Sequence, residues 1–226
     1  MFQRWQNLTF LHWRYQGETI QRLLPKGMEV DTFDGSAWVG LTPFVLSDLR
    51  APFTPAVPWL SRFPETNVRT YVKGPDGQRG VWFFTLEADR LLAVLAARAL
   101  YRLPYRWAAM QARQRSERVI EYRSRRKWPF GTAGTNIIIE RGERIVSGHF
   151  DHFLTARYRL YTVLGQRIGF ARIEHEPWSL YTGKVLRLQQ NLVEGSGLPQ
   201  PAGEPTVHFS RDIAVRIGRL EVFVNR

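Results

Sequence analysis

Apolar and polar residues alternate over short stretches along most of this chain, and turn-forming residues separate the stretches. Asp-Gly at 34–35 and Gly-Pro-Asp-Gly at 74–77 each stand between two such runs, and both are strong signals for tight turns between paired strands. Many short strands of this kind are typical of a β barrel or a sandwich. The pattern predicts strands at residues 8–15, 28–33, 36–46, 67–73, 79–86, 107–118, 119–127, 135–141, 158–164, 167–174, 184–193, 206–210 and 214–224.

Three segments have a helical pattern instead. The clearest is 89–101, where Asp89 can cap the first turn and Pro104 stops the helix. Its leucines leave little polar face, so we expect this helix to be largely buried. Shorter helices are expected at 17–24 and 149–156.

Two segments are predicted to be loops. Residues 49–64 contain four prolines, and we expect an ordered loop that buries Phe53, Trp59 and Phe63. Residues 195–205, rich in glycine and proline, are the best candidate for a flexible loop.

Composition limits the kind of protein and its chemistry. A chain of 226 residues, 44% of them hydrophobic, is expected to form a single domain over residues 1–226. The absence of cysteine excludes disulfides, thiolate nucleophiles and cysteine-based metal sites. The net charge is +12, and 32 residues are basic. The lysines among them are Lys26, Lys73, Lys127 and Lys184.

The chain shows no targeting or spanning signal. Residues 1–7 lack the apolar stretch of a secretory signal, and the longest apolar run, 91–97, is far shorter than the ~20 residues of a membrane span. We therefore expect a cytoplasmic protein with no membrane partner. Whether it forms a homo-oligomer is left open.

No common catalytic or cofactor motif is present. The sequence has no glycine-rich phosphate loop, no nucleophile-elbow serine and no His-Glu-x-x-His helix. His149 and His152 would share one face of a helix, but a zinc site would need further ligands. We predict neither a metal site nor a cofactor.

Several long strings of residues do resemble one family. They are Phe-Pro-Glu-Thr-Asn-Val-Arg-Thr-Tyr-Val at 63–72 with the turn and Val-Trp-Phe-Phe at 81–84, Leu-Pro-Tyr-Arg-Trp at 103–107, Asp-Thr-Phe-Asp-Gly-Ser-Ala-Trp-Val-Gly at 31–40, and Phe-Leu-Thr-Ala-Arg-Tyr at 153–158. Together they resemble the YqjF-like family of uncharacterised bacterial proteins, which is similar in fold to acetoacetate decarboxylase. The resemblance implies a mainly β (α+β) architecture. Its core would be a cone-shaped, mainly antiparallel β barrel with an internal ligand cavity and a few peripheral helices.

The same resemblance puts decarboxylase chemistry in doubt. The decarboxylase forms a Schiff base on a lysine whose pKa is lowered by a neighbouring cation. The matching segment here is Pro104-Tyr105-Arg106, so Tyr105 replaces the nucleophile and Arg106 its neighbour. A phenol cannot form an imine, and a guanidinium stays protonated. We therefore predict that the chain is not a lysine Schiff-base decarboxylase, and whether it is an enzyme stays open.

The residues of the expected cavity suggest a ligand site. Glu65 resembles the family's cavity carboxylate, and strand alternation would place Asn67, Arg69 and Tyr71 on the same side. Glu65 and Arg69 could form a buried structural pair. Alternatively, Arg69 or Arg106 could bind an acidic organic ligand such as a carboxylate. The candidate ligand-binding residues are Glu65, Asn67, Arg69, Tyr71, Trp82, Phe84 and Tyr105, and the candidate catalytic residues are Glu65, Tyr105 and Arg106.

A basic segment offers a second interpretation. Residues 111–127 contain seven basic and two acidic residues, and with Tyr122 and Trp128 for stacking they could contact nucleic acid. Strand alternation would split the basic residues between two faces, and no named nucleic-acid motif is present. A solvated face is favoured, with a basic nucleic-acid-binding domain as the alternative and a ligand-free interaction module as a third class.

Overall fold

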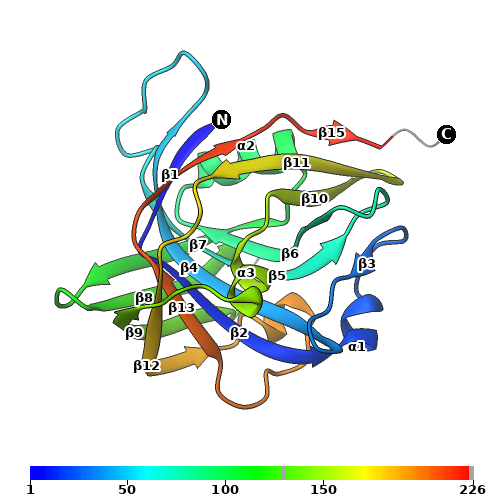
Figure 1. The fold of residues 1–226 in the computed structure, drawn as a ribbon. Coiled ribbons are helices and arrows are strands. Elements are labelled where there is room, and N and C mark those ends of the chain that lie inside the picture. The colour runs from blue at the N-terminus through cyan, green and yellow to red at the C-terminus, as the bar shows by residue number, and fades with distance from the viewer. Residues whose placement is uncertain (129–130, 224–226) are drawn as a thin grey trace.

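The computed structural model describes residues 1–128 and 131–223, of which the larger part is β structure (Figure 1). Strands make up 55% and helices 12% of the chain, as expected for a mainly β protein. The helical elements are α1 (Gly17–Gln21), α2 (Leu91–Tyr101), α3 (His149–Thr155) and the short 3₁₀ turn η1 (Glu194–Ser196). The strands are β1 (Phe2–Gln6), β2 (Leu8–Gln16), β3 (Glu29–Val30), β4 (Ser36–Arg50), β5 (Phe63–Lys73), β6 (Arg79–Ala88), β7 (Tyr105–Gln114), β8 (Val119–Trp128), β9 (Gly134–Arg144), β10 (Arg159–Leu164), β11 (Arg167–His175), β12 (Leu180–Gln190), β13 (Thr206–Ser210), β14 (Ile213–Ile217) and β15 (Glu221–Val222).

Twelve strands close into a ring. Their order is β1-β14-β11-β10-β6-β7-β8-β9-β12-β13-β2-β4, and the pairing of β1 with β4 completes the circuit. The pairings are antiparallel except at β6, which runs parallel to both β10 and β7. The expectation of a mainly antiparallel sheet is met, with β6 as the exception.

Strand β5 crosses this ring and divides its interior. It pairs with β4 on one side and β6 on the other. The result is a seven-strand circuit (β1, β14, β11, β10, β6, β5, β4) that shares β5 with a nine-strand circuit. Because both faces of β5 look into the protein, nine of its eleven residues are buried.

The nine-strand circuit is filled by apolar side chains. Leu11, Val39, Val68, Ile137 and Ile139 come from four different strands and are fully buried in one cluster. Strand β5 contributes Val68 to this cluster. The residues on either side of Val68 along the strand point into the seven-strand circuit. The seven-strand circuit therefore receives Glu65, Asn67 and Arg69 of β5.

The two strands of the first predicted hairpin do not pair with each other as expected. The turn at Asp34 and Gly35 forms as expected, with φ of 48° and 71° and a bridge from Phe33 to Ser36. Strand β3, however, is only two residues long and pairs with β5 instead of β4. The backbone N–H of Asp31 continues this pairing by donating to the carbonyl oxygen of Tyr71.

The prediction for α2 was right about its position and wrong about its cap and its burial. Asp89 does not cap the helix, because its carboxylate accepts from the backbone N–H of Met110 and pairs with Arg90. The helix ends before Arg102, which has a left-handed φ of 55°. Val94 is the fully buried residue of this helix, and most of its leucines are exposed.

The loop at 49–64 also differs from expectation. Phe63 is buried, but Phe53 and Trp59 are 106% and 68% exposed. The segment 195–205 is anchored by the buried side chain of Leu198 and by a hydrogen bond from Trp13 to the carbonyl of Gly203.

The remaining elements lie close to their predicted positions, with two differences at the chain ends. Strand β1 was not predicted. The predicted strand at 214–224 divides into β14 and β15, and its last residue lies outside the described ones. Among the described helices, none combines the length and the apolar character needed to cross a bilayer.

Candidate functional site

The seven-strand circuit encloses a cavity of about 80 Å³. Since one water needs roughly 10–15 Å³ by this measure, the space admits a small molecule of several heavy atoms. Each of the seven strands contributes to the wall, and the helix α2 covers part of it through Ala97 and Tyr101. The wall includes Trp5, Thr42, Phe44, Glu65, Asn67, Arg69, Val81, Phe83, Leu86, Leu103, Tyr105, Arg157, Leu160, Ile173, His175, Trp178 and Ile217.

Glu65 and Tyr105 meet in this wall, as the sequence predicted. Glu65 lies on β5 and is 3% exposed, while Tyr105 begins β7 immediately after the turn that ends α2. The Tyr105 hydroxyl donates a hydrogen bond of 3.0 Å to Oε2 of Glu65. Burial raises the pKa of Glu65 to about 8, against the opposing effect of the Tyr105 hydrogen bond. Glu65 is therefore mostly protonated at neutral pH.

Tyr105 is also kept neutral. Burial, followed by the neighbouring carboxyl group of Glu65, raises its pKa well above the ordinary value. The pair therefore supplies hydroxyl donors and oxygen acceptors to the cavity without a negative charge at pH 7.

Arg69 is a buried cation in the same wall. It is 7% exposed, and its guanidinium carbon lies 5.1 Å from the centroid of the Phe10 ring and 6.0 Å from that of Tyr71. Within the described parts of the chain, Arg69 has no carboxylate and Glu65 has no basic group within ion-pair distance. The structural pair between these two residues, one of the two alternatives from the sequence, is thus not formed.

Besides one atom of Arg157, three buried polar atoms in the wall have no hydrogen-bond partner among the described residues. They are Nε of Arg69, Oδ1 of Asn67 and Oγ1 of Thr42. Buried polar groups in folded proteins are nearly always satisfied, because leaving one unpaired costs roughly 1–3 kcal/mol. Their convergence on one cavity indicates a place for a polar ligand or ordered water.

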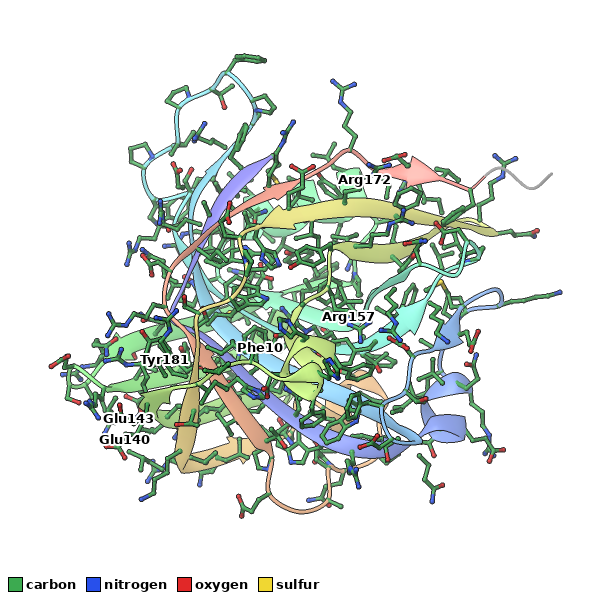
Figure 2. The ribbon with its side chains drawn as sticks, in the orientation of Figure 1. Phe10, Glu140, Glu143, Arg157, Arg172 and Tyr181 are labelled. Carbon is green, nitrogen blue, oxygen red and sulfur yellow. The ribbon has the colours of Figure 1, made fainter. Side chains whose placement is uncertain are left out.

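Arg157 is a second cation in the wall, and its charge is compensated. It follows α3 near the middle of the molecule (Figure 2). Its Nη1 donates to Asp31 at 2.6 Å, and both side chains are almost fully buried. Nη2 of Arg157 has no partner. Sequence reasoning did not single out this residue, although it lies within one of the strings that carried the family resemblance.

Tyr71 lies beside both arginines but serves the structure. Its hydroxyl donates to the carbonyl of Leu154 on α3 and lies 2.5 Å from Nε2 of His12. Its ring lies 4.8 Å from the guanidinium carbon of Arg157. Tyr71 is not part of the cavity wall, and it holds α3 against the cavity instead.

Three other candidates lie outside the cavity. On β6 it is Val81 and Phe83 that face inward, while Trp82 and Phe84 pack into other clusters. Arg106 follows Tyr105 on β7 and points to the opposite side, into an outer groove. Burial and the nearby Arg126 and Arg98 lower its pKa.

A β-bulge explains which β6 residues reach the cavity. Arg69 pairs with Phe83, whereas its neighbour Val68 pairs with Thr85, so Phe84 is an extra residue. An extra residue shifts the alternation of side chains. Leu86 therefore follows Phe83 into the wall.

None of the four lysines reaches this cavity. Lys73 pairs with Glu29 at 3.5 Å on the surface, and Lys127 lies over the ring of Trp107 at 4.6 Å. The described wall thus contains no lysine amine.

The basic segment is largely occupied by internal ion pairs. Arg115 and Arg123 both bind Glu121, and Arg126 is buried against Glu87. Tyr122, expected to stack on bases, is 2% exposed. The segment therefore offers less free charge and less stacking surface than its sequence suggested.

Sequence comparisons give two matches over nearly the whole chain. The model of the DUF2071 family, described as "Uncharacterized conserved protein", matches residues 2–214. The chain is 34% identical over 218 residues to "Uncharacterized protein YqjF" of Bacillus subtilis (strain 168), covering 93% of this chain and 87% of the relative.

Structural comparisons find proteins of the acetoacetate decarboxylase fold. An acetoacetate decarboxylase from Legionella pneumophila superposes with a TM-score of 0.67 at 13% identity, over 97% of this chain and 86% of the other. The enduracididine biosynthesis enzyme MppR, solved in complex with pyruvate, gives 0.68 at 10% identity, over 98% and 89%. Identities this low establish the fold and leave the activity undecided.

Proposed function

We propose that this chain, which belongs to the DUF2071 family, binds a small organic anion such as a carboxylate inside a cone-shaped, decarboxylase-like barrel. The observation that carries the proposal is Arg69, a buried guanidinium that faces the cavity and has no carboxylate partner within ion-pair distance among the described residues. An unpaired buried charge is costly, and a ligand carboxylate would compensate it through two parallel hydrogen bonds.

The rest of the wall fits such a ligand. Phe44, Phe83 and Leu103 provide apolar surface for a short carbon skeleton. Asn67 can accept a hydrogen bond and Thr42 can donate one. Because Glu65 is mostly protonated, it does not repel an anion at neutral pH.

The structural neighbours support this class of ligand. One is an acetoacetate decarboxylase by name, and another was solved with pyruvate bound. Acetoacetate and pyruvate are both small keto acids. Here the ligand would be held without an imine, because the wall contains Tyr105 and no lysine.

Calorimetric titration with matched ligands tests the proposal. Pyruvate, acetoacetate and butyrate should bind, and butyramide, which is neutral and of similar size, should bind at least tenfold more weakly. Replacing Arg69 by Met should weaken butyrate binding by about ten- to hundredfold, since a hydrogen bond to a charged group contributes roughly 1.5–3 kcal/mol. Arg187→Met, at an exposed arginine on β12, serves as the control and should leave binding unchanged.

Stability of the empty protein separates this proposal from a structural role for Arg69. If the guanidinium awaits a ligand, Arg69→Met should leave the free energy of unfolding unchanged or raise it, because an uncompensated buried charge is removed. Equal binding of butyramide and butyrate, or a destabilised variant with unchanged binding, would refute the proposal.

A further inference from the structure

A large apolar surface remains exposed on the described protein. Its side chains come from the loop between β4 and β5 and from the outer face of α2. Of the thirteen large hydrophobic side chains that are exposed in the described residues, seven belong to this surface. They are Phe53, Val57, Trp59, Leu91, Leu92, Leu95 and Leu100, and we refer to them together as the loop–α2 surface.

The loop and the helix are joined where α2 begins. Nε of Arg90 donates to the carbonyl of Trp59 at 2.9 Å, and the guanidinium lies 4.7 Å from the Trp59 ring. The loop then extends away from the body of the protein, at the upper left of Figure 1. An apolar helix face is normally covered by something.

Basic residues predominate around this surface. Residues 49–62 and 90–106 contain six arginines and no acidic residue. Arg50 pairs with Asp48 and Arg90 with Asp89, whereas the other four form no ion pair among the described residues. Those four are Arg62, Arg98, Arg102 and Arg106. Arg98, Arg102 and Arg106 surround one outer groove beside Leu95.

The backbone presents the two aromatic side chains outward. Phe53 and Trp59 have φ of 64° and 68°, a left-handed conformation that is rare for bulky residues. Residues in such conformations persist where the surrounding structure holds them, often at functional sites. The hydrogen bonds from Ser61 to Leu49 and from Val57 to Ser61 close the loop at its base.

We propose that the loop–α2 surface docks onto an anionic lipid bilayer, with Phe53 and Trp59 inserted at the interface and the arginines at the phosphate groups. Exposed aromatic and leucine side chains beside basic residues are the features by which proteins attach to such membranes without crossing them. A second copy of the chain fits less well, because facing copies would bring together the four arginines that have no acidic partner among the described residues. The inner face of α2 lines the cavity, so the docked bilayer would lie over the helix that covers the ligand site.

Vesicle flotation with the full chain tests the docking. Binding is measured to vesicles of phosphatidylcholine alone and of phosphatidylcholine with 30% phosphatidylserine. A net charge of +12 produces some binding to any anionic vesicle, so the informative comparison is between variants of equal charge. Arg62→Glu with Arg102→Glu should lower the partition coefficient at least tenfold more than Arg125→Glu with Arg187→Glu, which alters exposed arginines elsewhere.

A second pair of variants tests the apolar contact. Phe53→Ser with Trp59→Ser should lower binding about tenfold, and Val146→Ser with Leu186→Ser, at exposed sites outside the surface, should not change it. Brominated phosphatidylcholine should quench part of the tryptophan fluorescence, and this part should disappear in Trp59→Phe.

Two results would overturn the proposal. In the first, matched variants lose vesicle binding equally, which means that the net charge alone attracts the protein. In the second, sedimentation shows a dimer that Phe53→Ser with Trp59→Ser dissociates while vesicle binding is unaffected, which assigns the surface to a second copy.

Discussion

Replacing Glu65 by Gln should remove a pH-dependent loss of stability. Glu65 is buried, and among the described residues its one polar contact to a side chain is the hydrogen bond from Tyr105. Gln keeps the shape and can still accept that hydrogen bond, but it cannot ionise. The substitution therefore isolates the effect of the carboxyl proton.

The magnitude follows from the pKa of about 8, compared with 4.5 for an ordinary glutamate. In the folded protein Glu65 holds its proton up to about pH 8, whereas the unfolded chain releases it near pH 4.5. Folded protein therefore binds more protons than unfolded chain in this range, and stability falls as the pH rises. The loss is about 1.4 kcal/mol per pH unit, or on the order of 5 kcal/mol between pH 4.5 and pH 8.

Urea unfolding of both proteins at half-unit intervals from pH 4.5 to pH 9 measures this effect. The free energies of unfolding of the two proteins should agree near pH 4.5. As the pH rises, the variant should become more stable than the wild type, and the difference in free energy should level off above about pH 8. Glu143→Gln, at a carboxylate that is 84% exposed, should track the wild type. A constant difference across the whole range would refute the argument, because it would mean that Glu65 ionises at its ordinary pKa.

Three further predictions follow from the same wall. Above about pH 8 the wild type should lose up to tenfold in butyrate affinity per pH unit, because Glu65 ionises beside the ligand. The affinity of Glu65→Gln should stay constant over this range, and a parallel decline in both proteins would contradict the prediction. Asp31→Asn should lower the free energy of unfolding by about 3–5 kcal/mol, because it leaves Arg157 buried without its partner. Glu29→Gln, in an exposed ion pair, should lower it by less than about 1 kcal/mol. Equal effects of the two variants in urea unfolding would contradict a stabilising role for the buried pair. Incubation with acetoacetate and borohydride should leave the mass of the protein unchanged, and an adduct on any lysine would show that a Schiff base forms.

Local pattern was sufficient to find most of the strands. Alternation and turn residues lie within one segment, so the hairpin of β5 and β6 was predicted close to its observed bounds. The pairing of β5 with β4 as well depends on contacts between distant segments, and the pattern of a strand does not specify its second neighbour. The division of the ring into two circuits was for this reason not predictable.

The errors at α2 and its neighbouring loop have one origin. An apolar sequence indicates that a surface avoids water, but it does not say which molecule covers it. The leucines of α2 and the aromatic residues Phe53 and Trp59 have the composition of buried residues, yet the described chain supplies nothing to cover them. The sequence prediction of burial remains informative, because it is the reason to look for a covering surface outside the monomer.

The candidate site was predictable where it follows one strand. Glu65, Asn67 and Arg69 share a face of β5 by simple alternation. Trp82 and Phe84 were misplaced because a bulge sets the alternation of β6, and a bulge has no reliable signal in a single sequence. Arg157 was missed because its partner Asp31 is 126 positions away.

The neutral tyrosine at position 105 adds no charge to the wall beside Glu65. A lysine there would place an ammonium group near Glu65, and each charge would stabilise the other, so that Glu65 would ionise below its present pKa. With a phenol instead, both members of the pair remain neutral at pH 7. Arg157 is compensated by Asp31, whereas the Arg69 guanidinium in the described wall has no carboxylate partner. Tyrosine at this position thus supplies no imine-forming amine, and Glu65, which burial keeps protonated, does not repel the proposed anion.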